Sequence, residues 1–276
     1  RKDEPLISHL LMHVRQRERA GADFLKQSTD NLLAYAAWAE GEANLLALRY
    51  LFEGMGLADS VIELNLDPGD FLDGSLLSLD LERLPAAEES LVRFVYTEGF
   101  VQAALAYAEG GWSALDRAII LRTTTRDLLH PEAKSLPDLL LEEPQAVSEG
   151  LALADEDSLG EQGIVTLVST VTGKDNLGLL AGDGWADDRL LRWEPLQGDS
   201  AAGTTEWVTL WISEDEAADF DYAFGRTLEA RFRGIPLEST GPGERSLKTA
   251  KRLFRITHAG ERVHILITPA PATTPN

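Results

Sequence analysis

The sequence contains no cysteine, which excludes disulfides and zinc sites built from thiolates. It has no apolar run near the roughly 20 residues that a membrane-spanning helix requires. It also lacks a glycine-rich phosphate loop, a dinucleotide fingerprint and a nucleophile-elbow serine. Basic residues are scarce, with 25 against 46 acidic ones and a net charge of -21. Because such a chain repels phosphate backbones and anionic lipids, we expect neither nucleic acid nor a membrane surface as its partner.

Apolar residues recur at helical spacing through much of the first half of the chain. The spacing predicts helices over residues 5–28, 32–54, 85–108 and 112–120, with Gly110-Gly111 as the break between the last two. At 276 residues, of which 44% are hydrophobic, the chain is long enough for one large domain or two smaller ones with cores of their own.

The second half has a different pattern. Ser158-Leu-Gly-Glu161 fits a capping box, and it predicts a helix through the apolar run 164–171. Ser213-Glu-Asp-Glu216 fits another and begins a helix that continues to about Arg233. Alternating apolar runs predict four strands, at residues 188–193, 206–212, 252–257 and 262–268.

These patterns together predict an α+β protein. A mainly helical domain is expected at residues 1–150, followed at 158–268 by a small antiparallel β-sheet with one packed helix. Proline and acidic residues at 137–157 indicate a connection between the two. The tail, 269–276, is rich in proline and threonine and is expected to be disordered.

One stretch carries a pattern typical of metal ligands. His9 and His13 are four residues apart in a predicted helix, so both imidazoles would lie on one face and could bind one metal ion. The same pattern is also common for ordinary buried or surface histidines. Leu10 occupies the position at which the zincin motif H-E-x-x-H carries the glutamate that serves as general base.

Two carboxylates lie about one helix later in the sequence. Glu40 and Glu42 fall in the middle of a long apolar helix. Burying an unpaired charge there would destabilise the fold by an amount on the order of several kcal/mol. They therefore need a partner. A metal ion, an arginine such as Arg49 or a histidine could each provide it.

The order of short motifs resembles a family of exported bacterial gluzincin-type metallopeptidases, whose motifs include H-E-L-T-H-A-L-Q, E-G-D-A, G-G-W, S-T-E-Q-I-L-H-P-E and G-W-G-G-D-R. The resemblance extends from about residue 5 to about residue 270. The matching stretches here are His9-Leu-Leu-Met-His13-Val-Arg-Gln16, Glu40-Gly-Glu42-Ala, Phe94-Val-Tyr96-Thr-Glu-Gly99, Gly110-Gly-Trp112, Thr123 to Glu132 with His130-Pro131, and Gly184-Trp185-Ala-Asp187-Asp188-Arg189.

The resemblance implies a zincin-like helical domain in which His9, His13 and Glu40 are the metal ligands and zinc is the cofactor. Glu42 stands where the family has an aspartate, and it would support the ligands without binding the metal. Tyr96 and His130 would line the cleft, although a histidine before a proline more often belongs to a surface turn, and a core tyrosine needs no functional explanation. Leu10 departs from the family at its general base, so no catalytic residue is assigned.

The functional expectation is a catalytically inactive metallopeptidase-like protein, a binding or scaffolding subunit of an extracytoplasmic assembly that could be membrane-associated. Its expected partner is another protein. The alternative is a zinc metallopeptidase with a displaced base, such as Glu42. The chain begins at Arg1, so we expect that a signal or upstream segment has been removed. If the centre is retired altogether, no metal is expected.

Overall fold

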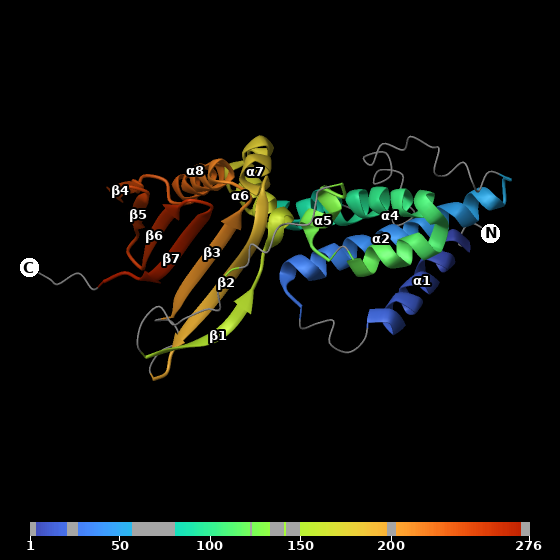
Figure 1. Cartoon of the computed structure of the whole chain (residues 1–276), viewed down its shortest axis with the longest axis horizontal. Helices are drawn as coiled ribbons and strands as arrows, with labels where there is room; N and C mark the ends of the chain where they lie inside the picture. The colour runs from blue at the N-terminus through green and yellow to red at the C-terminus, as the bar shows by residue number, and fades with distance from the viewer. Residues whose placement is uncertain are drawn as a thin grey trace, which may run out of the picture. The chain divides into compact units, whose positions relative to one another are not determined.

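The computed structural model describes residues 4–20, 27–56, 81–121, 123–132, 141, 150–197 and 203–271. The chain divides into two compact units, Arg1–Ala133 and Lys134–Asn276. The α+β class that the sequence predicts is confirmed: helices precede a seven-stranded antiparallel sheet (Figure 1). No helix in the described ranges is both long and apolar enough to cross a membrane.

The first unit is helical in its described part (Figure 1). Its helices surround an alanine-rich core that includes Trp38 and Leu45. They are α1 (Glu4–Ala20), α2 (Thr29–Glu53), the short 3-10 helix η3 (Leu81–Arg83), α4 (Ala86–Leu121) and α5 (Thr125–Leu129).

Local sequence explains where these helices begin and bend. α2 begins after Ser28, whose side chain accepts a hydrogen bond from the backbone N–H of Asn31. α4 is interrupted at the predicted place, because Gly111 has φ 67° and ψ -158°, a conformation that only glycine adopts readily. The predicted break at Gly110-Gly111 is therefore present.

The backbones of two helices approach each other very closely where α2 crosses α4. A Cβ atom added to Gly41 would lie 2.0 Å from the carbonyl oxygen of Gly99, and one added to Gly99 would lie 2.0 Å from that of Ala37. Such distances are far inside van der Waals contact, so the crossing requires both glycines. The close approach brings side chains of α4 within reach of those on the same part of α2.

The second unit contains one antiparallel sheet in the order β1-β2-β3-β7-β6-β5-β4. Its strands are β1 (Leu151–Asp157), β2 (Trp185–Pro195), β3 (Thr204–Trp211), β4 (Glu238–Gly241), β5 (Glu244–Lys248), β6 (Arg252–Ala259) and β7 (Arg262–Pro269). Its helices are α6 (Gly160–Thr172), α7 (Asp175–Gly182) and α8 (Glu214–Arg231).

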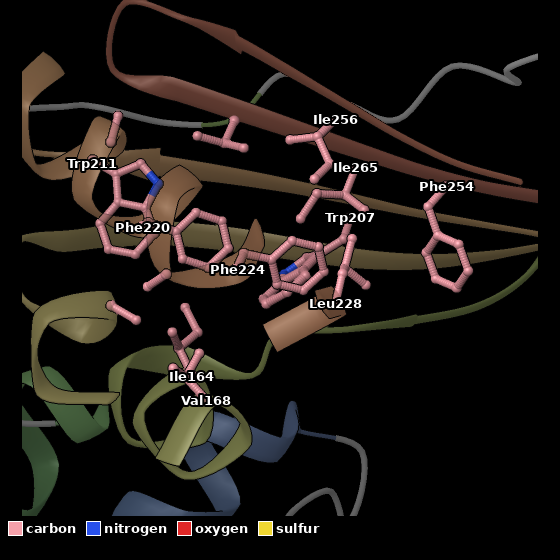
Figure 2. Close-up of a cluster of buried hydrophobic side chains, with 14 of the residues drawn as sticks. Ile164, Val168, Trp207, Trp211, Phe220, Phe224, Leu228, Phe254, Ile256 and Ile265 are labelled. Carbon is pink, nitrogen blue, oxygen red and sulfur yellow. The ribbon is translucent and has the colours of Figure 1, made fainter. Parts of the chain in front are cut away.

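Aromatic side chains join α8 to the sheet (Figure 2). Trp207 of β3 contacts both Phe220 and Phe224 edge-on, and Trp211 stacks on Phe220 with ring centroids 4.7 Å apart. α8 begins where the second capping signal predicts, because the Ser213 side chain accepts from the backbone N–H of Glu216. Together with Ile164 and Val168 of α6, these residues form the buried core of the unit.

A buried carboxylate organises the entry to α6. Asp188 is 1% exposed and lies on β2. It accepts five hydrogen bonds, from the hydroxyl of Ser158, the backbone N–H groups of Leu159 and Gly160, and the indole N–H groups of Trp185 and Trp207. These donors satisfy both of its oxygens and tie the first turn of α6 to β2 and β3.

Several details differ from the sequence predictions. The sheet has seven strands where four were predicted, because β1, β4 and β5 add to it, and α7 was not predicted either. Residues 151–157 were predicted as part of a connection, but they form β1, an exposed strand that pairs with β2. The sequence of β1, Leu-Ala-Leu-Ala-Asp-Glu-Asp, has no β-branched residue. Pairing with β2, and not local propensity, therefore makes it a strand. The expected capping box at Ser158 is absent, because the Ser158 hydroxyl donates to Asp188, whose carboxylate caps α6 instead. Residues 272–276 of the predicted tail lie outside the described ranges.

We predict that Gly99→Ala destabilises the first unit by about 1–3 kcal/mol, the usual cost of overpacking a tight contact. Unfolding in urea, followed by far-ultraviolet circular dichroism, measures the change. Gly54→Ala is the matched control, since its Cβ would meet only the Leu51 carbonyl oxygen, at 3.5 Å. Equal stability of the two variants would contradict the claim that the crossing of α2 and α4 requires glycine at position 99.

We predict that Asp188→Asn lowers the stability of the second unit by about 3 kcal/mol or more, because an amide NH₂ would face donors that now bond to a carboxylate. Tryptophan fluorescence during urea unfolding reports this unit through Trp185 and Trp207. The control is the neighbouring Asp187→Asn. Burial raises the pKa of Asp187, so folding disfavours its ionised form, and a neutral amide of the same size is expected to cost much less there than at Asp188.

Candidate metal centre

The three predicted ligands meet between α1 and α2. His9 and His13 lie one turn apart on α1, and their Nε2 atoms are 2.9 Å apart. On α2, Oε2 of Glu40 lies 3.5 Å from Nε2 of His9, and Oε1 of Glu40 lies 3.5 Å from Nε2 of His13. In the described part of the chain these residues form the one group of three or more potential ligands whose donor atoms lie within 4.8 Å of one another.

The spacing of these atoms fits zinc. Nitrogen and oxygen ligands lie about 2.0–2.1 Å from a zinc ion, so two ligands of a tetrahedral site are roughly 3.3 Å apart. The two imidazole nitrogens are 2.9 Å apart, and each lies 3.5 Å from a different oxygen of Glu40, so these separations fall on either side of this value. Two imidazoles and one carboxylate are also the protein ligands of many catalytic zinc sites, which keep a fourth position open. The residues present therefore fit the ion that the motif implies.

Burial sets the electrostatics of His9. Its side chain is 2% exposed. Burial is the main reason that its pKa falls to about 4; the nearby His13 lowers it further, and a polar contact with Asn44 works in the opposite direction. His9 is consequently neutral at physiological pH. The neutral imidazole is the form that binds a metal ion.

Glu40 is an acid in an environment that disfavours its charge. Burial raises its pKa, while His13 and a hydrogen bond from Tyr96 act against the rise. Its Oε2 atom is buried and, among the described residues, has no hydrogen-bond partner. Oε2 lies 3.5 Å from Nε2 of His9, and a buried carboxylate oxygen beside a neutral imidazole is suited to bind a cation.

Tyr96 reaches Glu40 from α4. It lies one turn before Gly99, so the tight crossing of α2 and α4 places its phenol beside the carboxylate. Burial and the adjacent Glu40 raise the pKa of the phenol, which therefore stays protonated and donates a hydrogen bond. The structure thus places Tyr96 beside a ligand, as expected for a residue that lines the centre.

Glu42 lies behind the ligands. It is fully buried, and its carboxylate accepts hydrogen bonds from Nε2 of Gln16 at 3.0 Å and from Arg19 at 3.1 Å. Gln16 in turn lies 2.8 Å from Nδ1 of His13. Glu42 therefore acts on the centre through Gln16, and its partner is Arg19, not the Arg49 suggested by the sequence.

Three residues of this network carry no assigned role in the sequence analysis: Gln16, Arg19 and Asn44. Gln16 is three residues beyond His13 on α1, and Asn44 is four beyond Glu40 on α2, so helical periodicity from each ligand would have identified both. Arg19 was not identifiable in this way, because its pairing with Glu42 and with Asp116 of α4 depends on how the helices pack.

His130 and Leu10 take no part in the ligand group. His130 is the C-terminal cap of α5, and its ring nitrogens do not belong to the cluster formed by His9, His13 and Glu40. Leu10 is 53% exposed on α1. It continues an exposed apolar surface made of Ile7, Leu10, Leu11 and Val14, which we call the α1 apolar surface.

Comparisons with known proteins concern the other unit. Residues 149–276 match a family described as a domain of unknown function (DUF8575). No curated protein and no solved structure matches the chain. The match covers less than half of the chain and none of the residues of the metal centre, so the chemistry of the centre rests on its geometry.

We predict that the purified chain binds about one zinc ion, as expected for a site with three protein ligands. Metal content measured by mass spectrometry after purification without chelators or a histidine tag tests this. His13→Ala and Glu40→Gln should each lose the ion, whereas His258→Ala, which changes a half-buried histidine of the second unit, should retain it. Equal zinc in all three variants would contradict the ligand set.

Proposed function

We propose that this chain is a metallopeptidase-like protein that retains a zinc-binding centre, lacks hydrolytic activity and serves as a binding subunit of an extracytoplasmic assembly. One observation carries the proposal. Three ligands of zinc-peptidase type converge, while Leu10, at the position of the general base in the related motif, is an exposed leucine. A hydrocarbon side chain takes no proton from water.

Zinc at this centre would supply a Lewis acid that polarises a bound carbonyl or water. The residues of the chain would hold the ion and shape its surroundings. His9, His13 and Glu40 would bind it, and Tyr96 would fix the carboxylate of Glu40 through its hydrogen bond. A hydrolytic enzyme also needs a residue that accepts a proton at the open position.

The carboxylates near the ligands are poorly suited to replace the missing base. Glu42 is fully buried, and its two oxygens are engaged by Gln16 and Arg19. Glu98, two residues after Tyr96 on α4, has a pKa raised by burial, but no contact among the described residues joins it to the ligands. These observations disfavour a zinc peptidase with a displaced base.

The α1 apolar surface supports a binding role. Its side chains at positions 7, 10, 11 and 14 recur at helical spacing and are 52–62% exposed. They lie on the helix that carries both histidines. Contiguous apolar surfaces of this kind are typical of sites that bind other proteins. The large negative charge of the chain disfavours anionic lipid as the alternative occupant.

We predict that the zinc-loaded wild-type chain cleaves neither casein nor a peptide library, and that Leu10→Glu gains chelator-sensitive cleavage. The introduced carboxylate would follow His9 directly, as in H-E-x-x-H. Leu10→Gln is the matched control, because it has similar size but no basic group, and it should remain inactive. Cleavage by the wild type that is lost in His13→Ala would refute the proposal, and loss in Glu98→Gln would identify a displaced base.

A further inference from the structure

Gln16 makes contacts at both ends of its side-chain amide. It is 4% exposed and lies on α1, three residues after His13. Its Nε2 atom is 2.8 Å from the backbone carbonyl oxygen of Ala39 and 3.0 Å from Oε2 of Glu42. Its Oε1 atom is 2.8 Å from Nδ1 of His13. The amide therefore joins a metal ligand on α1 to two groups on α2.

The chemistry of these neighbours fixes the direction of the amide. A backbone carbonyl and a carboxylate paired with a guanidinium offer only acceptors, so both must face the NH₂ end of Gln16. The opposite assignment would place the amide oxygen against two other oxygens. The oxygen of Gln16 therefore faces His13, and an oxygen at this distance accepts a hydrogen bond from Nδ1–H.

This hydrogen bond selects the state of the His13 imidazole. A neutral imidazole carries one N–H, so a proton held at Nδ1 leaves Nε2 with a free lone pair. Nε2 is the His13 atom that lies in the ligand cluster, 3.5 Å from Glu40. The 2.9 Å contact between the two Nε2 atoms then requires His9 to be the donor and His13 the acceptor.

We propose that Gln16 is a positioning residue of the metal centre, which holds the Nδ1–H form of His13 and so presents its Nε2 lone pair to a cation. The inference rests on the zinc-binding role proposed above. Glu42 and Arg19 extend the arrangement: Glu42 orients Gln16, Arg19 holds Glu42, and Asp116 of α4 lies 3.2 Å from Arg19. Outer hydrogen bonds of this kind fix the orientation of metal-binding histidines in proteins generally.

Two substitutions separate this role from packing. Gln16→Met keeps the length of the side chain but removes the acceptor for Nδ1–H. Gln16→Glu keeps an acceptor for His13 but sets a second carboxylate against Glu42 and the Ala39 carbonyl. Packing alone predicts that Gln16→Glu is the more damaging variant in every measurement. The positioning role predicts that Gln16→Met is less destabilised yet loses the selected form of His13.

The test combines two measurements on the full chain. Nitrogen-15 NMR of the imidazoles without metal locates the proton on His13, whose signals are assigned with His13→Ala among only five histidines. Competition with a chromophoric chelator gives the zinc affinity. We expect Nδ1–H in the wild type and in Gln16→Glu, its loss in Gln16→Met, and zinc binding about 10–100-fold weaker in Gln16→Met. Thr125→Val, which removes a hydroxyl that bonds to Asp30 in the same unit, is the control for stability.

The outcomes separate the two proposals. If the wild type binds zinc and Gln16→Met binds it equally tightly with His13 unchanged, Gln16 is not a positioning residue while the zinc centre stands. If the wild type binds no zinc but the proton on His13 still moves in Gln16→Met, the metal proposal fails and the hydrogen-bond assignment stands. A loss of affinity in Thr125→Val equal to that in Gln16→Met would also overturn the positioning role.

Discussion

A carboxylate removed from water must receive hydrogen bonds or face a cation, and both units of this chain depend on how that requirement is met. In the second unit, Asp188 is surrounded by uncharged N–H and O–H donors that join a helix start to two strands. In the first unit, Glu42 is paired with Arg19 and Gln16. Glu40 is the exception, because its Oε2 atom lacks such a donor within the described structure; Oε2 lies beside the imidazole of His9, and Oε1 lies beside that of His13.

That contrast gives the first unit its chemical character. A fully satisfied carboxylate such as Asp188 fixes a fold and has little capacity left to bind a ligand. A carboxylate that shares its site with two imidazoles has capacity for a cation. The tight crossing at Gly41 and Gly99 matters for the same reason, because it brings Tyr96 to Glu40, where the phenol donates a hydrogen bond to the carboxylate.

The centre also explains how ligand binding and catalysis can separate. Holding zinc requires three donor atoms at fixed separations, together with the outer residues that orient them. Hydrolysis requires in addition one proton acceptor at the open position. Under the proposed function, the leucine at position 10 would remove the second requirement and leave the first unaffected, because its exposed side chain is not part of the ligand cluster. In the same proposal, this side chain would add to a surface that binds another protein.

Sequence periodicity determined much of this structure. The positions of α2, α4 and α8, the break at Gly110-Gly111 and the four long strands follow from local patterns of apolar residues, caps and glycines. The spacing of His9 and His13 likewise follows from the helix repeat alone. Each of these features is decided within a few residues of chain, so the local sequence is sufficient to predict it.

Tertiary structure decided the rest. β1 has little strand propensity and exists because β2 offers it a partner, and the cap of α6 comes from Asp188, about 28 residues away in sequence. The convergence of Glu40 on the histidines, the pairing of Arg19 with Glu42 and the orientation of Gln16 depend on the packing of α1, α2 and α4. Helical periodicity predicts which face of its helix a residue occupies. Only the packing of the helices determines which residues of another helix that face contacts. Buried polar groups have lost their water, so they must find hydrogen-bond partners wherever the fold provides them.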